Sequence, residues 1–146
     1  MNDFDGAIAE FRAAVKLKPD FALGHSNLGK ALEIKGELSE ALAEYRKASE
    51  IAPDDPWPLN GLAWLYATAK DSRVKDAGKA LEYALKAARL SQRKDPQVLD
   101  TLAEAYFANG RFDLAIATEN EAIAISPETP EFAESLERYR KAKEGK

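Results

Sequence analysis

The chain has few side chains of the types that carry out acid–base, nucleophilic or metal chemistry. His25 is the only histidine among 146 residues, and there is no cysteine. His25 recurs with Leu28 and Leu32 at helical spacing, so the three side chains would share one helix face. We therefore expect His25 to be a partly buried packing residue rather than a general base. No second histidine or cysteine completes a zinc site, and no glycine-rich loop follows a strand to hold phosphate.

Paired carboxylates are the remaining candidates for catalysis. Asp54 and Asp55 fall at a turn between two apolar patterns, and Glu119 and Glu121 fall on an expected charged helix face. A pair that hydrolyses glycosides would have to converge in one pocket, and no pattern in the sequence brings these carboxylates together. We therefore predict that the chain is not an enzyme, and that it needs no cofactor and no metal.

The charge and the start of the chain limit the class of partner and the compartment. The net charge is −4, with both signs interspersed, whereas a binder of nucleic acid or of anionic membranes needs a basic face. Residues 1–5 lack the basic stretch and apolar core of a signal peptide. No apolar run approaches the roughly 20 residues of a membrane helix. We therefore expect no nucleic-acid partner, no direct membrane insertion, and a soluble chain with the cytoplasm favoured.

Helices must position these residues, because apolar side chains recur at helical spacing along the chain. Between Ala22 and Asp55 two such patterns are separated by Gly36 and closed by Pro53. Glycine accepts the left-handed conformation that ends a helix. Two amphipathic helices joined by so short a turn must lie antiparallel and share one apolar seam. One such hairpin cannot bury its whole apolar surface, so it needs neighbours on both sides.

The same pattern recurs along the chain at intervals of about 34 residues. The series Leu38, Ala41, Leu42, Tyr45, Ala48, Ile51 and Pro53 is matched earlier by Phe4, Ala7, Ile8, Phe11, Ala14, Leu17 and Pro19. Later copies contain Leu62-Ala63, Tyr66, Ala80, Ala84, Ala87 and Leu90, and then Leu102-Ala103, Tyr106, Gly110, Phe112, Ala115, Ala122, Ile125 and Pro127. The starts Asp55-Pro56, Asp95-Pro96 and Thr129-Pro130 support the same boundaries, since Asp caps a helix and Pro suits its first turn.

This pattern closely resembles the tetratricopeptide repeat family, and the resemblance covers nearly the whole chain. It implies an all-α, right-handed solenoid of helix–turn–helix repeats. We expect a single domain over 1–146, divided into a half repeat at 1–20, repeats at 21–55, 56–95 and 96–129, and a C-terminal capping helix at 130–146. The chain departs from the family where His25, Leu59 and Leu99 replace a frequent Trp, and where Glu119 replaces a frequent aromatic residue.

The repeat at 56–95 carries an inserted turn at 70–76. It contains the three cations Lys70, Arg73 and Lys75 in place of a tight glycine turn. Because loops tolerate such insertions, we expect a solvated loop. A basic contact point for an acidic partner is the alternative.

By resemblance to the family, the first helix of each repeat lines the concave side of the solenoid, where ligands usually bind. The candidate peptide-binding residues on this face are Asn27, Lys30, Trp57, Asn60, Trp64, Asp100, Glu104 and Phe107. Trp57 and Trp64 are two helical turns apart and project from one side, with a gap at Gly61 between them. Trp57 is expected to be a partly exposed anchor for a ligand, whereas Trp64 either packs against a neighbouring helix or joins Trp57. Asn27 and Asn60 would hold a peptide backbone through their amides.

The charges on this face indicate which ligand it prefers. Some members of the family hold a ligand's terminal carboxylate with a cluster of Lys, Arg and Asn, but here only Lys30 and the asparagines fit that scheme. Asp100 and Glu104 contribute the opposite sign. Our hypothesis is a ligand segment with an apolar anchor near Trp57 and a cation near Asp100 and Glu104.

The sequence therefore predicts a non-catalytic scaffold that binds a protein or peptide segment on its concave face. One alternative is a regulatory or targeting fragment of a larger protein, favoured by the missing first helix of the half repeat. The other is self-assembly, with a possible homo-oligomer formed through the N-terminal helix. The residues expected to be exposed for self-association are Phe4, Ile8, Phe11 and Val15.

Overall fold

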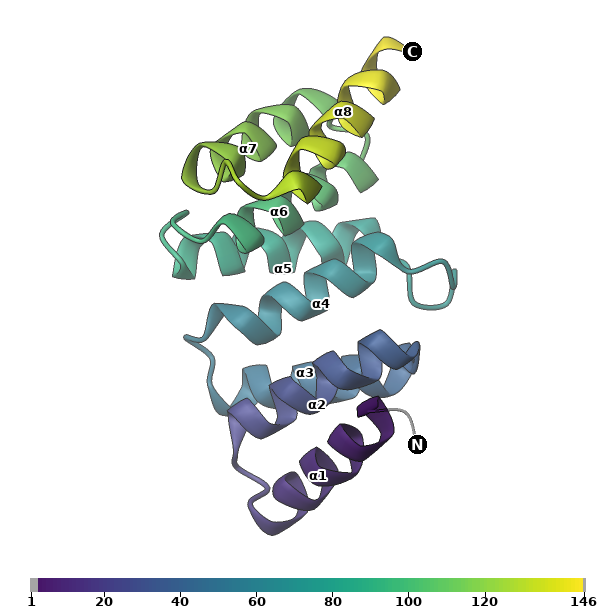
Figure 1. The fold of residues 1–146 in the computed structure, drawn as a ribbon, viewed down its shortest axis with the longest axis vertical. Helices are drawn as coiled ribbons and strands as arrows, with labels where there is room; N and C mark the ends of the chain where they lie inside the picture. The colour runs from purple at the N-terminus through teal and green to yellow at the C-terminus, as the bar shows by residue number, and fades with distance from the viewer. Residues whose placement is uncertain (1–2, 146) are drawn as a thin grey trace.

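The computed structural model describes residues 3–145 and contains, within that range, eight α-helices and no strand. The helices are α1 (Asp3–Leu17), α2 (Ala22–Lys35), α3 (Leu38–Ile51), α4 (Pro56–Thr68), α5 (Ala77–Leu90), α6 (Pro96–Ala108), α7 (Phe112–Ile125) and α8 (Pro130–Glu144). They stack in order along the long axis of the molecule, with α1 at one end and α8 at the other (Figure 1). The predicted all-α helical repeat solenoid is confirmed.

Local sequence signals set the helix boundaries. The Asp55 side chain accepts a hydrogen bond from the Trp57 backbone N–H at 3.0 Å, and Asp95 caps α6 in the same way. Both aspartates precede a proline in the first turn, where the missing N–H leaves no unpaired donor. At the end of α2, Gly36 adopts φ 86°, a left-handed conformation that costs glycine nothing. These capping and turn signals recur with the period of the repeats. Helices therefore begin and end at equivalent positions in successive repeats.

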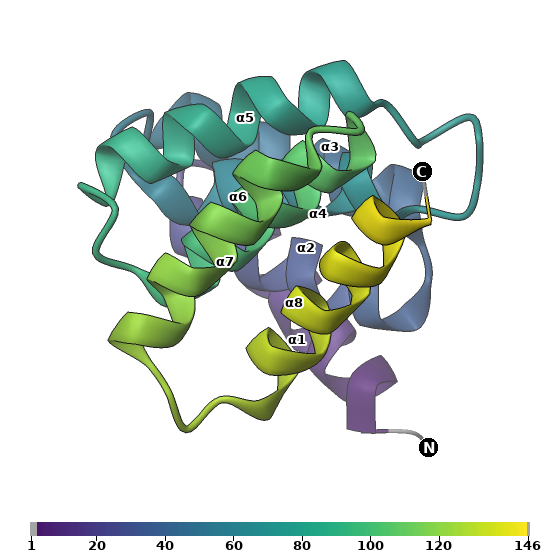
Figure 2. The same cartoon turned by 90° about the horizontal axis from the view of Figure 1, so that it is seen from above.

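The helices pair as hairpins that then stack. The most extensive packing joins α2 with α3, α4 with α5, and α6 with α7. Successive pairs meet chiefly through α3 with α4, α4 with α6, and α5 with α6, while α1 packs on α2 and α8 packs on α7. Seen along the stack, α3 and α5 lie on one side (Figure 2). The helix bounds agree with the expected repeat ranges, and the division into repeats remains a prediction.

Small side chains allow this close stacking. One buried cluster runs from Ile8 on α1 to Ala105 on α6, and two smaller clusters join α6, α7 and α8 around Phe132 and Tyr139. The helix seams contain the fully buried alanines Ala41, Ala48, Ala80, Ala84, Ala87, Ala115 and Ala122. Alanine at a seam lets two helix backbones approach closely without strain. The hydrophobic core is therefore elongated along the stack of hairpins and is not a single compact centre.

The inserted turn is not solvated throughout, contrary to our expectation. Val74 is buried and joins the main core, and the Asp76 backbone N–H donates to the Tyr66 carbonyl at 3.0 Å. Asp76 also caps α5. Lys70, Arg73 and Lys75 remain exposed as predicted. The apolar Val74 holds the insertion against α4, while its three cations and Ser72 face solvent.

The N-terminal helix is also more buried than the sequence suggested. Ile8 was predicted to be exposed for self-association, and this prediction is wrong, since Ile8 is only 2% exposed within the core. Phe11 and Val15 are partly buried against the same core, and Phe4 alone of the four stays exposed. Because α2 covers the apolar stripe of α1, the face left for a partner is smaller than expected.

The last helix buries one face and exposes a charged one. Phe132, Leu136 and Tyr139 are buried, whereas Lys141 and Lys143 lie in its last turn, where cations stabilise the helix dipole. Within residues 3–145, no helix combines the length and apolarity needed to cross a bilayer.

Candidate functional site

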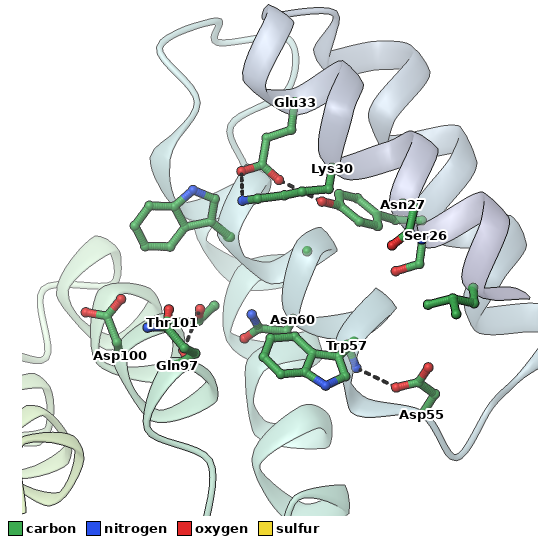
Figure 3. Close-up of a pocket in the computed structure, with 14 residues that line it drawn as sticks. Ser26, Asn27, Lys30, Glu33, Asp55, Trp57, Asn60, Gln97, Asp100 and Thr101 are labelled. Atoms are coloured by element: carbon green, nitrogen blue, oxygen red, sulfur yellow. Dashed lines mark hydrogen bonds and ion pairs between the residues drawn. The ribbon is translucent and has the colours of Figure 1, made fainter. Parts of the chain in front are cut away.

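A hollow of about 810 Å³ opens on the side of the stack formed by α2, α4 and α6. We call it the inner hollow. Its walls are Leu23, Ser26, Asn27, Lys30, Glu33, Tyr45, Asp55, Trp57, Asn60, Gly61, Trp64, Gln97, Asp100 and Thr101. In Figure 3, Asn27 and Lys30 of α2 lie on one side of the space and Gln97 and Asp100 of α6 lie on the other, with Asn60 and Trp57 of α4 between them. One first helix from each of three successive hairpins thus contributes to a single surface.

The floor of the inner hollow is the ring of Tyr45, which comes from the outer helix α3. A Cβ atom on Gly61 would lie 2.5 Å from Tyr45 Cζ, and one on Gly29 would lie 2.9 Å from Tyr45 Cδ1. The ring therefore fits between α2 and α4 only because both positions lack a side chain. The gap that we expected at Gly61 is filled.

Tyr45 is also fixed by a hydrogen bond. Its hydroxyl donates to Glu33 at 2.8 Å, and Lys30 donates to the other oxygen of Glu33 at 2.7 Å. Burial of the ring, together with the neighbouring Glu33 charge, raises the pKa of Tyr45 well above its usual range. The phenol is therefore neutral at physiological pH. The charge of Lys30 is already balanced by Glu33, which leaves it less available to an acidic ligand.

The two tryptophans differ in exposure. Trp57, in the first turn of α4, is 48% exposed, and Trp64, two turns later, is half-buried. Neither Asn27 nor Asn60 makes a side-chain hydrogen bond to another residue in the described range, and Asn60 Oδ1 is buried without a partner. The inner hollow thus contains an exposed aromatic ring beside amides whose hydrogen-bonding capacity is unused.

Three carboxyl groups converge beside the inner hollow, those of Asp100 and Glu104 from α6 and that of Glu119 from α7. Glu104 is buried and paired with Arg138 of α8, and the Tyr139 hydroxyl donates to it at 2.8 Å. Glu119 is fully buried, although we predicted it on a charged helix face, and that prediction is wrong. No N–H or hydroxyl donor from the described residues reaches either oxygen of Glu119.

The protonation of Asp100 and Glu119 reflects this burial. Loss of solvent, and then the Glu104 charge, raise the pKa of Asp100 to about 6. Loss of solvent, and then the charge of Asp100 and a hydrogen bond with it, raise the pKa of Glu119 to about 8. At neutral pH the pair therefore keeps one proton, which lies between the two carboxyl groups.

Six of the eight predicted peptide-binding residues line the inner hollow, namely Asn27, Lys30, Trp57, Asn60, Trp64 and Asp100. Glu104 and Phe107 instead line a smaller neighbouring hollow of about 330 Å³. There the Arg138 guanidinium stacks on the Phe107 ring, 4.9 Å from its centroid. Trp64 lines both hollows.

Sequence reasoning missed Tyr45, Glu119 and Arg138. One signal was available for Arg138, because it follows Glu104 by 34 residues, which is one repeat period. Equivalent positions of adjacent repeats stack, so the pair could have been proposed from spacing alone.

His25 lies outside the inner hollow and has a packing role, as expected. It is buried on α2, with Nδ1 2.6 Å from Glu44 Oε2 and Nε2 2.9 Å from the Pro19 carbonyl oxygen. Both ring nitrogens are therefore engaged within the protein. Among residues 3–145, no group of three or more His, Cys, Asp or Glu side chains has a geometry that could hold a metal ion.

The sequence of this chain is similar to those of known proteins. A family model described as "Tetratricopeptide repeat" matches residues 1–56 and 62–130. Cellulose synthase operon protein C of Pseudomonas fluorescens (strain SBW25) is 33% identical over 93 residues, which are 64% of this chain and 7% of that protein. Protein STIP1 homolog of Dictyostelium discoideum is 31% identical over 119 residues, which are 81% of this chain and 20% of that protein. The chain thus spans a fifth or less of the length of these relatives.

A solved structure shares the fold. It is described as the first TPR of Spaghetti (RPAP3) bound to HSP90 peptide SRMEEVD, and it superposes with a TM-score of 0.72 at 21% sequence identity. The match covers 83% of this chain and 94% of that chain. At this level of identity the likeness shows the common fold and nothing about the ligand.

Proposed function

The chain belongs to the tetratricopeptide repeat family, and from that premise we propose that it is a non-catalytic scaffold that binds a segment of another protein in the inner hollow. Repeats of this family are generally protein-interaction modules without catalytic activity. The side chains that line the inner hollow support the same role, because they are suited to binding a peptide rather than to catalysing a reaction on it.

The observation that carries this proposal is the combination of Trp57 with Asn27 and Asn60. A half-exposed Trp offers a large apolar area at the cost of ordering only two torsions, and such residues dominate binding energy at interfaces. An extended peptide has backbone N–H and C=O groups that need partners once water is excluded. The amides of Asn27 and Asn60, which bond to nothing else in residues 3–145, can supply them.

A relative with the same fold supports the choice of a peptide as ligand. The first TPR of Spaghetti is described as bound to an HSP90 peptide, and it covers most of this chain. Its acidic ligand is not carried over, because Lys30 here is paired with Glu33 and Asp100 faces the inner hollow.

A displayed library of random peptides, selected on the immobilised chain, tests the proposal. Peptides that enrich should bind wild type and lose at least tenfold in affinity to the Trp57→Ala/Asn60→Ala variant. The matched control is Leu114→Ala, an equally exposed apolar residue on the outer helix α7. Equal affinity for both variants would contradict binding in the inner hollow.

A longer parent protein remains a second candidate context. The chain covers only 7% and 20% of the two relatives described above, so in that context the inner hollow would recruit or target a protein whose chemistry lies elsewhere. The test is whether the inner hollow binds the same peptides in the longer protein as in this chain.

Self-association through α1 is the third candidate, supported by the exposure of Phe4 and Leu17. Sedimentation at several concentrations tests it. Phe4→Glu should abolish any dimer and Trp57→Ala should not. Ile8→Glu is unsuitable, since Ile8 is in the core and the charge would unfold α1.

A further inference from the structure

Carboxyl groups outnumber cations at one wall of the inner hollow and directly behind it. Asp100 and Glu104 come from α6, Glu119 comes from α7, and the guanidinium that pairs within this group is Arg138 of α8. Arg138 and the Tyr139 hydroxyl are both directed at Glu104. Asp100, which faces the inner hollow, therefore has no cation of its own.

The carboxyl group of Glu119 lies behind Asp100 and cannot be solvated. It is fully buried, and no conventional donor within residues 3–145 reaches it. Its neighbour is the Asp100 carboxyl group, and two carboxyl groups form a hydrogen bond only when a proton lies between them. This buried, otherwise unpartnered group stores a proton directly behind the exposed wall.

The other charged groups around Asp100 leave this arrangement in place. Across the inner hollow, Lys30 and Glu33 of α2 pair with each other. From α4, Trp57, Asn60 and Trp64 face the inner hollow, and none of them titrates near neutral pH. Lys75, in the inserted turn, lines the smaller hollow beside Glu104 and Arg138. The raised pKa values of Asp100, about 6, and of Glu119, about 8, agree with an incompletely neutralised pair.

We propose that the inner hollow takes a basic side chain, Lys or Arg, of the bound segment against Asp100, and that this cation displaces the proton held between Asp100 and Glu119. The O–H bond of this carboxyl group breaks, the proton passes to the solvent, and no bond between heavy atoms changes. The indole of Trp64, which lines the same wall, covers the apolar stem of the basic side chain and interacts favourably with its charge. This inference rests on the proposed function, since it names the chemistry of the segment that the inner hollow binds.

Linkage fixes the sign of the pH dependence. A cation favours the ionised pair, and rising pH also favours it, so affinity for a basic segment must increase with pH. We expect an increase of about tenfold between pH 5.5 and pH 7.5, from release of up to one proton. A neutral segment should show little change over the same range.

The probes are three displayed libraries of random nine-residue peptides with a central Lys or Arg, a central Gln, or a central Glu. The basic library should enrich most strongly. If the Gln or Glu library enriches as well or better, the inference is overturned and the proposed function stands. If no library enriches, both are overturned.

Calorimetry on the basic peptide that binds most tightly then measures how many protons are released on binding. Titrations at one pH, in buffers that differ in ionisation enthalpy, should reveal net proton release. Asp100→Asn should weaken the basic peptide at least tenfold and its Gln counterpart less than twofold. Asp54→Asn, a change at an exposed turn outside the inner hollow, is the control.

A second variant keeps the test decisive if Asp100→Asn folds poorly. Glu119→Gln has nearly the same shape and carries no titratable proton, so it should abolish proton release at pH 7.5, where Asp100, with a pKa of about 6, is already ionised. Circular dichroism establishes that each variant is folded. Proton release at pH 7.5 that persists in folded Glu119→Gln, or its absence in wild type, would overturn the inference.

Discussion

The ring of Tyr45 occupies the space in front of Gly61, where a Cβ atom would lie 2.5 Å from Tyr45 Cζ. Tyr45 comes from the outer helix α3 and Gly61 from the inner helix α4 of the next hairpin. This contact joins two successive hairpins and also forms the floor of the inner hollow. Stability and the shape of the candidate site therefore depend on the same pair of residues.

Replacing Gly61 with Ala should destabilise the protein, because the added methyl group displaces the buried Tyr45 ring. We expect a loss of about 1–3 kcal/mol in the free energy of unfolding, measured with urea. Gly6→Ala is the control, since a Cβ there meets no atom within 4 Å and Ala favours the helix by about 0.5–1 kcal/mol. A Gly61→Ala protein as stable as the control variant would contradict the close contact.

Replacing Trp57 with Ala should weaken peptide binding much more than it weakens the fold. The side chain is about half exposed, so we expect less than about 1 kcal/mol change in the free energy of unfolding. Loss of an aromatic anchor should lower the affinity for a library-selected peptide by about thirtyfold. Thermal unfolding and fluorescence anisotropy measure the two quantities. If stability fell and affinity did not, Trp57 would be a structural residue only.

The stability of the wild type should fall as pH rises. The folded pKa values of Glu119, about 8, and Asp100, about 6, lie above the ordinary values of 4.5 and 3.8. The folded state therefore binds more protons than the unfolded state above about pH 4, and its stability decreases as pH rises through 6 and 8. Urea unfolding at pH 5, 7 and 9 measures this slope.

The variant Glu119→Gln assigns that slope to the buried pair. Its neutral amide needs no proton, so between pH 5 and pH 9 it should lose about 1–3 kcal/mol less stability than wild type. Glu50→Gln, on an exposed face of α3, should keep the wild-type slope. The account would be wrong if Glu119→Gln kept that slope too.

Replacing Arg138 with Met should destabilise the C-terminal end of the stack. Met retains contact with the Phe107 ring but leaves the carboxylate of Glu104, whose side chain is 8% exposed, without its cation. We expect a loss of about 1–3 kcal/mol, which urea unfolding measures. Arg73→Met breaks an ion pair with Asp71 in the exposed turn and should change stability far less, because solvent screens that pair. Equal effects would mean that the Glu104–Arg138 pair contributes no more than a surface pair.

The fold could be predicted from the sequence because its determinants are local and repeated. The apolar spacing from Leu38 to Ile51, the glycine at Gly36 and the caps at Asp55 and Asp95 each specify a helix or its end. Each signal recurs with the period of the array. A helix whose own signals are weak can therefore be predicted from the equivalent helices of the other repeats. The stacking of hairpins follows, since none of them can bury its apolar face alone.

The candidate site was only partly predictable, because contacts between repeats decide which side chains stay free. The faces of α2 and α4 could be assigned from spacing, which placed Trp57 and Asn60 together. Nothing within one helix indicates that Tyr45 reaches across to Gly61. The replacement of a frequent aromatic residue by Glu119 was a signal that this position is buried, but it did not show that Asp100 lies beside it. Glu119 has the residue type of a solvated face, and its burial follows from the docking of α8, which is a tertiary effect.

Nuclear magnetic resonance of the two indole N–H groups tests the central claim most directly. The chain has two tryptophans, and both Trp57 and Trp64 line the inner hollow. Spectra of Trp57→Phe and Trp64→Phe assign the two signals, and a library-selected peptide is then titrated into ¹⁵N-labelled wild type. If the inner hollow binds a protein segment, both indole signals shift in a saturable manner, and backbone shifts concentrate on α2, α4 and α6. A peptide that binds while both indole signals stay fixed, with shifts confined to α3, α5 and α7, would contradict it.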